Sequence, residues 1–106
     1  MRKIKINYWN AKTPEGEEIK ESIISVVSAL ISNKKTEELP KGIEYFRLFN
    51  RIANSFEKAE ATGELIFEEK EYVFIKQMIE KDIPAMWALN INIKNAVDDF
   101  LNAIEE

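Results

Sequence analysis

The residues best suited to acid–base or metal chemistry are carboxylates, and they gather at two places in the sequence. Four glutamates fall between residues 64 and 71, and Asp98 is followed directly by Asp99. Oxygen ligands of this kind suit Mg²⁺ or Ca²⁺, but the chain has no calcium-loop spacing of Asp, Asn and Gly. Adjacent aspartates on a helix point about 100° apart and seldom chelate one ion. We interpret the glutamates as a solvated first helical turn and expect no metal and no cofactor.

The chain contains no histidine and no cysteine. The commonest general base, the commonest transition-metal ligand and the thiol nucleophile are therefore absent. A hydrolase with paired carboxylates would need two such groups in one cleft with separated pKa values, and nothing in the sequence locates that cleft. We therefore predict a protein that is not an enzyme, and a carboxylate enzyme with a metal is only the third hypothesis.

Two arginines are the first candidates for recognition. Arg47 and Arg51 are four residues apart, so they share one face of a predicted helix. A guanidinium suits bidentate contact with a phosphate or with the carboxylates of a partner. The alternative is ordinary surface charge that pairs with neighbouring side chains of the same helix.

Asparagines and tryptophans are the other candidates. Asn90, Asn92 and Asn95 occur within six residues, although asparagine is a poor helix former. Such a group indicates either a partly buried polar network or an exposed face used for recognition. Trp9 and Trp87 are either core residues with polar tips or anchors of an interface, where tryptophan is enriched.

Composition indicates a single domain spanning residues 1–106. Hydrophobic residues make up 45% of the chain and charged residues 32%, which is typical of a folded protein. No apolar run approaches the roughly 20 residues of a membrane span. The net charge of −4 disfavours a nucleic-acid-binding surface, which is normally a concentrated basic face. We expect a cytoplasmic protein without membrane or nucleic-acid partners.

The elements that position these residues are mostly helices, because the chain has only three glycines and three prolines. Alternation over residues 3–9 predicts one strand, with Ile4, Ile6 and Tyr8 on a single face. Its basic side chains should pair across a two-stranded ribbon with the mostly acidic strand 64–67. We expect this ribbon to lie on helices, because two strands alone are marginally stable.

Helices are expected at about residues 13–35, 43–62, 68–81 and 84–105. Thr13 and Pro14 suit the cap and first residue of the first helix, and Gly63 suits the left-handed position that ends the second. Residues 87–93 also alternate as a strand would. We favour a helix there because the apolar period continues to Ile104.

The apolar stripes of the four helices predict the core. The side chains expected on these stripes are, helix by helix, Ile19, Ile23, Val26, Val27, Leu30 and Ile31; Ile43, Phe46, Phe49, Ile52, Ala53, Phe56 and Ala59; Tyr72, Ile75, Met78 and Ile79, with Ile83 one turn on; and Met86, Leu89, Ile93, Val97, Phe100, Leu101 and Ile104. These apolar side chains are more than a small core needs. We therefore expect some of them to form a surface for self-association.

One segment resembles a known group of proteins. It runs from Phe46 to Glu80 as FRLFNRIANSFEKAEATGELIFEEKEYVFIKQMIE. Its pattern is similar to small accessory proteins encoded by phages and prophages, which often carry an amphipathic helix, a Gly-x-Leu-x-Phe/Leu-Glu step, then Glu-Tyr and a second helix. The resemblance covers about a third of the chain and includes no catalytic signature. It implies a protein that acts by binding in the host cytoplasm, as a virion or packaging accessory or as an inhibitor of a host protein.

We therefore predict an α+β fold, predominantly α, with about four helices in a small bundle and one two-stranded ribbon. The first functional hypothesis is a non-catalytic protein–protein interaction module that forms a homo-oligomer. The alternative is a small-ligand protein that binds a phosphate or nucleotide at an oligomer interface. The predicted contacts for either function are Arg47, Arg51, Asn90, Asn92, Asn95, Trp87 and Trp9.

Overall fold

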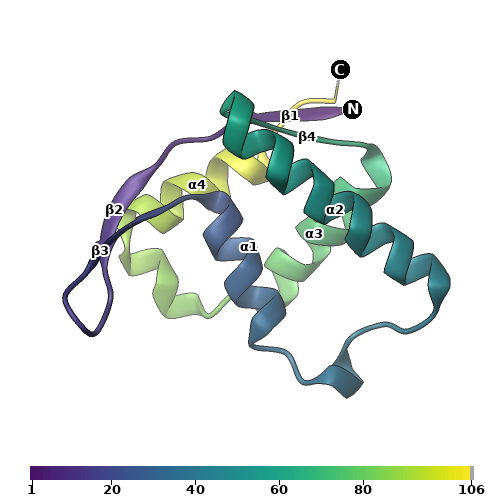
Figure 1. Ribbon diagram of the computed structural model, residues 1–106, viewed down its shortest axis with the longest axis horizontal. Coiled ribbons are helices and arrows are strands. Elements are labelled where there is room, and N and C mark those ends of the chain that lie inside the picture. Colours follow the sequence, from purple (N-terminus) through teal and green to yellow (C-terminus); the bar gives the residue numbers. More distant parts are fainter. Residues whose placement is uncertain (106) are drawn as a thin grey trace.

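The computed structural model describes residues 1–105, which form an α+β fold dominated by helices (Figure 1). The predicted fold class is confirmed, although two small antiparallel sheets make the chain more than an all-helical bundle. None of the helices in residues 1–105 has both the length and the hydropathy needed to cross a bilayer. The elements, in chain order, are β1 (Arg2–Lys5), β2 (Trp9–Lys12), β3 (Glu18–Glu21), α1 (Ile23–Ser32), the 3₁₀-helix η1 (Thr36–Glu38), α2 (Ile43–Thr62), β4 (Glu64–Phe67), α3 (Glu69–Asp82), the 3₁₀-helix η2 (Ala85–Leu89) and α4 (Ile91–Leu101).

The first sheet is the predicted ribbon, but its first strand ends at Lys5 rather than at residue 9, and Trp9 begins β2 of the second sheet. β1 pairs antiparallel with β4, in a register that sets Arg2 opposite Phe67 and Lys5 opposite Glu64. Opposite charges therefore face each other at one end of the ribbon. Ile4 is buried because alternate residues of β1 point to the core. The ribbon lies at the top of Figure 1, beside both termini.

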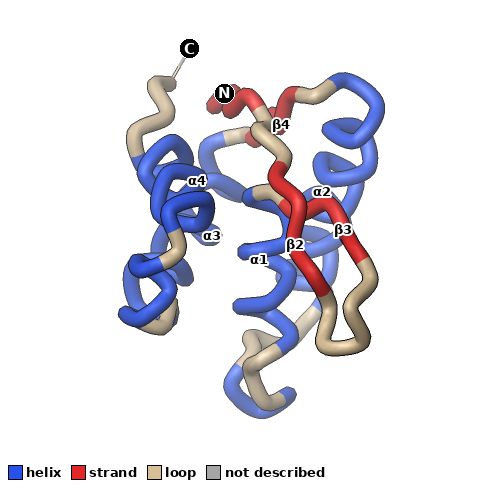
Figure 2. Tube along the Cα trace, turned by 90° about the vertical axis from the view of Figure 1, so that its left-hand side faces the viewer, coloured by secondary structure: helices blue, strands red, loops and turns tan. Residues whose placement is uncertain are grey.

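The second sheet is a hairpin, and its turn and second strand lie where the first helix is expected. β2 pairs antiparallel with β3, and the hairpin lies alongside α1 (Figure 2). The Thr13 amide donates to the Glu17 carbonyl oxygen at 2.9 Å, and Gly16 has a φ of +86°. The fixed φ of Pro14 suits a tight turn as well as a helix start, and Gly16 supplies the positive φ that closes the loop. The predicted helix start at Thr13 is therefore wrong.

α1 begins directly after Ser22, which supplies a different cap. The Ser22 hydroxyl accepts a hydrogen bond from the Ile24 amide at 3.2 Å, and the Ser25 hydroxyl accepts one from the Ser22 amide at 3.1 Å. Two helix-start amides are thus satisfied reciprocally. α1 packs against α3 and α4, and Lys34, just beyond its end, pairs with Asp82 at the end of α3 at 2.7 Å.

The stretch from α2 to α3 follows the prediction closely. α2 ends at Thr62, and Gly63 takes the left-handed conformation with a φ of +77°. The Gly63 amide donates to the Ala59 carbonyl oxygen at 2.7 Å, as an αL cap requires. The chain then passes through β4 into α3, which buries Tyr72, Ile75, Met78 and Ile79 of its predicted apolar stripe. Ile83, also expected on this stripe, lies just past the end of α3 and is half-buried.

The last helix begins later than expected. Pro84 precedes η2, and α4 starts after Asn90, whose side-chain oxygen accepts hydrogen bonds from the amides of Asn92 at 3.0 Å and Ile93 at 3.3 Å. Asparagine is among the best N-cap residues, so it separates the two helical segments. The predicted helix start at Pro84 is wrong, and residues 87–93 contain no strand.

The core lies between the ribbon, α1, α3 and α4, and α2 packs over β4 and α3. Several residues expected to face it are exposed instead. These are Tyr8, Ile19, Ile43, Phe46, Ala53, Met86, Leu89 and Ile104. The hairpin places Ile19 in a strand, the first turns of α2 extend past α3 (Figure 1), and η2 turns Met86 and Leu89 outward.

Candidate functional site

The structure brings together three of the seven predicted contact residues. Trp9, Asn92 and Asn95 line a cleft between β2 and α4, with a volume of about 560 Å³. Asn90 and Trp87 do not line it, and both predicted arginines lie on α2. We name this feature the Trp9 cleft. Its lining residues are Asn7, Tyr8, Trp9, Ile23, Asn92, Asn95, Ala96, Asp98 and Asp99.

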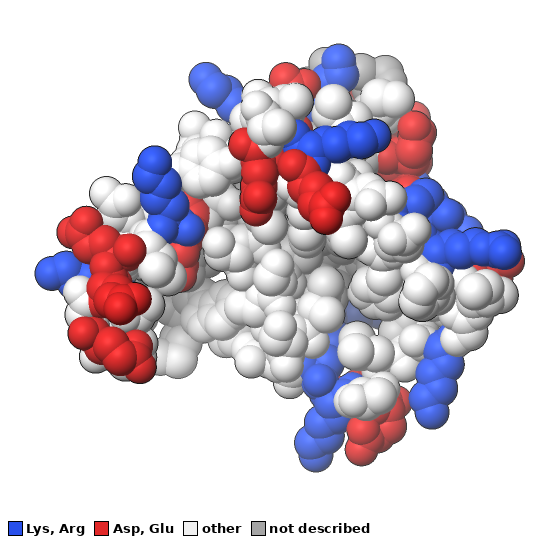
Figure 3. Space-filling view, in the orientation of Figure 1, with Lys and Arg blue, Asp and Glu red and all other residues white. Residues whose placement is uncertain are grey.

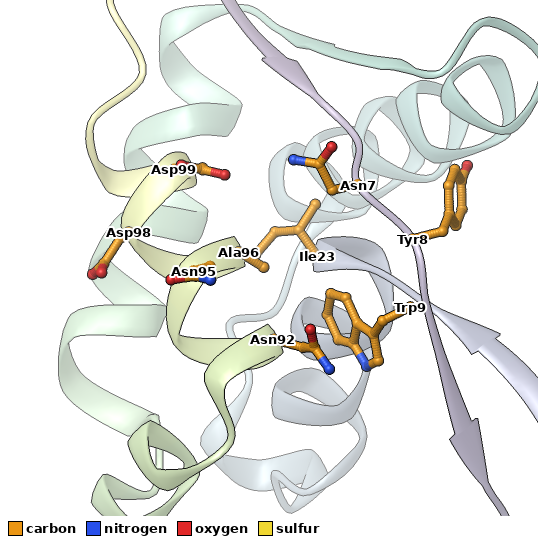
Figure 4. A pocket seen from close by; sticks show the side chains of 9 residues that line it. All are labelled: Asn7, Tyr8, Trp9, Ile23, Asn92, Asn95, Ala96, Asp98 and Asp99. Carbon is orange, nitrogen blue, oxygen red and sulfur yellow. The ribbon is translucent and has the colours of Figure 1, made fainter.

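Two segments build the Trp9 cleft from opposite sides, as Figure 4 shows. The extended chain before and into β2 directs Asn7 and Trp9 towards α4 and Tyr8 away from it, because alternate side chains of an extended chain point in opposite directions. On α4, Asn92 and Asp99 are seven residues apart, so they lie about two turns apart on one face. The cleft therefore combines an indole, amides and a carboxylate from distant parts of the chain.

Apolar side chains lie between these two polar walls. Ile23, the first residue of α1, is buried, and Ala96 of α4 is half-buried. Both line the cleft, and in Figure 4 they lie between the two segments. Packing of α1 against α4 thus fixes the separation of the walls.

The polar groups of the cleft are negative or neutral. Among residues 1–105, no lysine or arginine lines it. Asp98 pairs with Lys94 at 3.2 Å, whereas Asp99 has no ion pair among residues 1–105. The side-chain amides of Asn7 and Asn95 make no hydrogen bond within that same range. The cleft therefore offers a carboxylate and amide groups whose hydrogen-bonding capacity the described chain leaves unused.

Arg51 has a structural partner. Its Nε lies 2.7 Å from Oε1 of Glu71, a carboxylate whose side chain is only 5% exposed. A buried charge is costly unless it is paired, so Arg51 first serves to balance Glu71. Arg51 also borders a second cleft of about 540 Å³ beside α2 and β4, where Lys58, Glu64 and Glu68 mix both signs of charge. Arg47 lies one turn before it on α2 and is exposed.

The second cleft also contains a serine and a lysine at the spacing of a nucleophile and its base. Ser55 and Lys58 are three residues apart on α2, and both line this cleft. A lysine acts as a base when it is desolvated, whereas Lys58 is exposed. We therefore assign no nucleophile to this pair.

Two of the four glutamates in the acidic cluster that the sequence singles out, Glu69 and Glu71, form ion pairs with arginines. Arg2 donates from Nε and Nη2 to the two carboxylate oxygens of Glu69 at 3.0 and 2.9 Å. This hydrogen bonding holds the pKa of Glu69 below its usual range. The Arg2 guanidinium also lies 4.5 Å from the centre of the Tyr72 ring. Among residues 1–105, no group of three or more acidic side chains is placed to hold a metal ion.

Tyr72 completes this cluster. Its hydroxyl donates to the carbonyl oxygen of Phe100 at 2.7 Å, and its ring stacks on the Phe100 ring at 4.9 Å. Burial raises the pKa of the Tyr72 hydroxyl. The polar groups of Arg2, Glu69 and Tyr72 thus all have partners. Their contacts join β1, α3 and α4, so we assign them to the stability of the fold.

Six of the nine residues that line the Trp9 cleft are not among the predicted contacts, and these six include Asn7 and Asp99. The signal for these two is periodicity: Asn7 precedes Trp9 by two residues in an extended chain, and Asp99 follows Asn92 by seven in a helix. The sequence does not show that the side of the extended chain with Asn7 and Trp9 lies opposite the face of α4 with Asn92 and Asp99.

Comparisons with models of protein families, with curated proteins and with solved structures find no match to the chain. Function is therefore inferred from the surface and the clefts of the molecule itself.

Proposed function

We propose that the protein is a non-catalytic interaction module that binds a protein partner at the junction of η2 and α4. The surface concerned consists of Met86, Leu89 and Ile91, named here the corner surface. These residues are 72%, 88% and 61% exposed, respectively. This concentration of exposed large apolar side chains within six residues is the observation that carries the proposal.

Local structure explains why these side chains point outward together. In a 3₁₀-helix, residues three apart lie on the same side, which aligns Met86 with Leu89. Trp87, between them, packs against the core and anchors the segment. Large apolar groups held in this way commonly mark protein interaction sites, because their burial by a partner is favourable.

A second exposed apolar group supports self-association. Ile43, Tyr45 and Phe46, in the first turns of α2, are 59%, 41% and 68% exposed. We propose that this α2 surface joins two copies of the chain. It lies on a different helix from the corner surface, so one copy would still offer the corner surface to a partner.

The sequence agrees with a binding role. The absence of histidine and cysteine removes the usual catalytic side chains. The resemblance of residues 46–80 to phage and prophage accessory proteins supports a virion accessory, or an inhibitor of a host protein, acting in the cytoplasm. The phosphate-binding alternative is less well supported, because no arginine or lysine lines the Trp9 cleft and Arg51 is paired with Glu71.

Two matched double variants test the proposal. Met86→Ser with Leu89→Ser alters the corner surface, and Ile43→Ser with Phe46→Ser alters the α2 surface. Both change exposed residues, so we expect both proteins to fold with little loss of stability. Each tagged variant is used to capture partners from a lysate of the source cells, quantified by mass spectrometry, and its solution mass is measured by light scattering.

The corner variant should lose the partner that the unaltered protein captures and keep the solution mass of the unaltered protein. The α2 variant should keep the partner and become a monomer. Equal capture by the unaltered protein and the corner variant would refute the assigned surface. A monomeric unaltered protein that captures no partner would refute the proposed function.

A further inference from the structure

We infer that the Trp9 cleft receives an arginine side chain of the protein partner. This inference rests on the proposed function, because the cleft adjoins the corner surface. Ile91 belongs to the corner surface, and the next residue, Asn92, lines the cleft. A partner that covers the first would reach the opening of the second.

The charge of the cleft favours a cation. Asp99 has no ion pair among residues 1–105, and in Figure 4 it lies across the cleft from Asn7. In the described part of the chain, Lys94 is the one cation paired with a lining residue. It pairs with Asp98 and does not line the cleft itself. A guanidinium can bind a carboxylate through two parallel hydrogen bonds, which an ammonium cannot do.

The shape of the lining favours a flat cation over a compact one. Trp9 presents its indole towards α4, beside Asn92 (Figure 4). A guanidinium stacks on such a ring and is less strongly hydrated than an ammonium, so it loses less on entering the cleft. Asn7 and Asn95 also line the cleft, and the described chain leaves their side-chain amides without hydrogen bonds, so their oxygens are available as acceptors for the remaining donors.

The surroundings of the cleft add to this preference. The hairpin that carries Trp9 holds four glutamates and two lysines between residues 9 and 21. Figure 3 shows acidic side chains gathered over this hairpin, on the left of the molecule. The amides of Asn92 and Ile93 at the start of α4 are already bonded to the Asn90 side chain. They are therefore not free to attract an anion, and a basic segment of a partner is the favoured occupant.

Short peptides test the inference without knowledge of the partner. The ¹⁵N-labelled full chain is titrated with acetyl-Gly-Arg-Gly-amide at low ionic strength and followed by NMR. Two matched peptides replace arginine with lysine or with citrulline, which has nearly the same shape but no charge. The indole N–H of Trp9 reports on the cleft, and that of Trp87, which does not line it, is the internal control.

We expect the arginine peptide to shift the NMR signals of the Trp9 indole and of the side-chain amides of the cleft. The dissociation constant should be on the order of 1–10 mM, because one exposed ion pair and one cation–π contact are weak. The lysine peptide should bind more weakly, and the citrulline peptide should leave Trp9 unshifted. Asp99→Asn should weaken arginine binding about fivefold. Glu60→Gln, which removes an exposed charge from α2, should leave it unchanged.

Three results would overturn the inference: equal binding of citrulline and arginine, an unchanged constant in Asp99→Asn, or shifts at Trp87 without shifts at Trp9. Failure of this inference is distinguishable from failure of the proposed function. Loss of peptide binding with intact, corner-dependent partner capture rejects the arginine alone. Peptide binding by a chain that is monomeric and captures no partner rejects the proposed function.

Discussion

Replacement of Tyr72 by phenylalanine isolates one hydrogen bond at the end of α4. The ring of Tyr72 is 1% exposed, and its hydroxyl donates to the carbonyl oxygens of Phe100 at 2.7 Å and Leu101 at 3.3 Å. Carbonyls in the last turn of a helix lack intrahelical partners, so this hydroxyl satisfies acceptors that would otherwise be exposed to an apolar core. Tyr72→Phe keeps the ring and its stacking on Phe100 and removes only the donor.

The expected loss follows from the remaining partners. A net hydrogen bond contributes about 0.5–1.5 kcal/mol, and a buried group left wholly unpaired costs about 1–3 kcal/mol. The Phe100 carbonyl oxygen also accepts from the Ala103 amide at 3.3 Å, so it keeps one weaker partner. We therefore expect a loss of about 1–1.5 kcal/mol in the free energy of unfolding, which corresponds to about 5–7 °C in Tm for a domain of this size.

Thermal unfolding followed by circular dichroism measures this change. Tyr45→Phe is the matched control, because Tyr45 is 41% exposed and its hydroxyl makes no hydrogen bond within residues 1–105. The control should change Tm by less than about 2 °C. If both variants show the same Tm, the hydroxyl of Tyr72 does not hold the end of α4.

The pH dependence gives a second readout of the same side chain. Burial raises the pKa of Tyr72 above the usual value of 10.0. The contribution of a group with a raised pKa is complete below the unfolded value and is lost as the pH rises through the folded value. Unaltered protein should therefore lose stability above about pH 10, and Tyr72→Phe should lose less over the same range. Parallel pH profiles of the two proteins would contradict this.

Three further changes test the local accounts. Glu69→Gln should lower Tm at pH 7 and flatten the fall in Tm below pH 4.5. The pKa of Glu69 is lowered, so its contribution to stability is present above pH 4.5 and lost in acid. Identical Tm profiles of the variant and the unaltered protein from pH 7 to pH 3 would contradict this. Asn90→Ala should cost about 1 kcal/mol by urea unfolding, and Asn90→Asp should keep most of that stability because aspartate also caps. Gly16→Ala should lower the free energy of unfolding by about 1 kcal/mol in the same assay. No described atom lies within 4 Å of the added carbon, so the cost comes only from the φ of +86°. An unchanged free energy of unfolding would show that the hairpin turn relaxes.

Local patterns with one physical meaning are predicted correctly. Gly63 ends α2 because its position needs a left-handed residue, and α3 buries four of the residues expected on its apolar stripe. The β1–β4 pairing follows from a basic strand and an acidic strand that each bury alternate residues. These features depend on neighbours in the sequence and on simple charge complementarity.

Patterns with two meanings are not resolved by sequence alone. Thr13-Pro14 suits a helix start and a hairpin turn equally, and only the pairing of β2 with β3 selects the turn. Asn90 is interpreted as a recognition residue, yet its side chain caps α4. The Trp9 cleft depends on how α4 packs beside β2, so its residues are separately recognisable but their meeting is a tertiary result.

Hydrogen exchange on the captured complex tests the central claim most directly. Amide protection is compared between the free chain and the chain bound to its partner, segment by segment. We expect the partner to increase amide protection at residues 85–93, where the corner surface lies, and to leave the first turns of α2 as in the free chain. Protection confined to α2, with residues 85–93 exchanging as in the free chain, would contradict it.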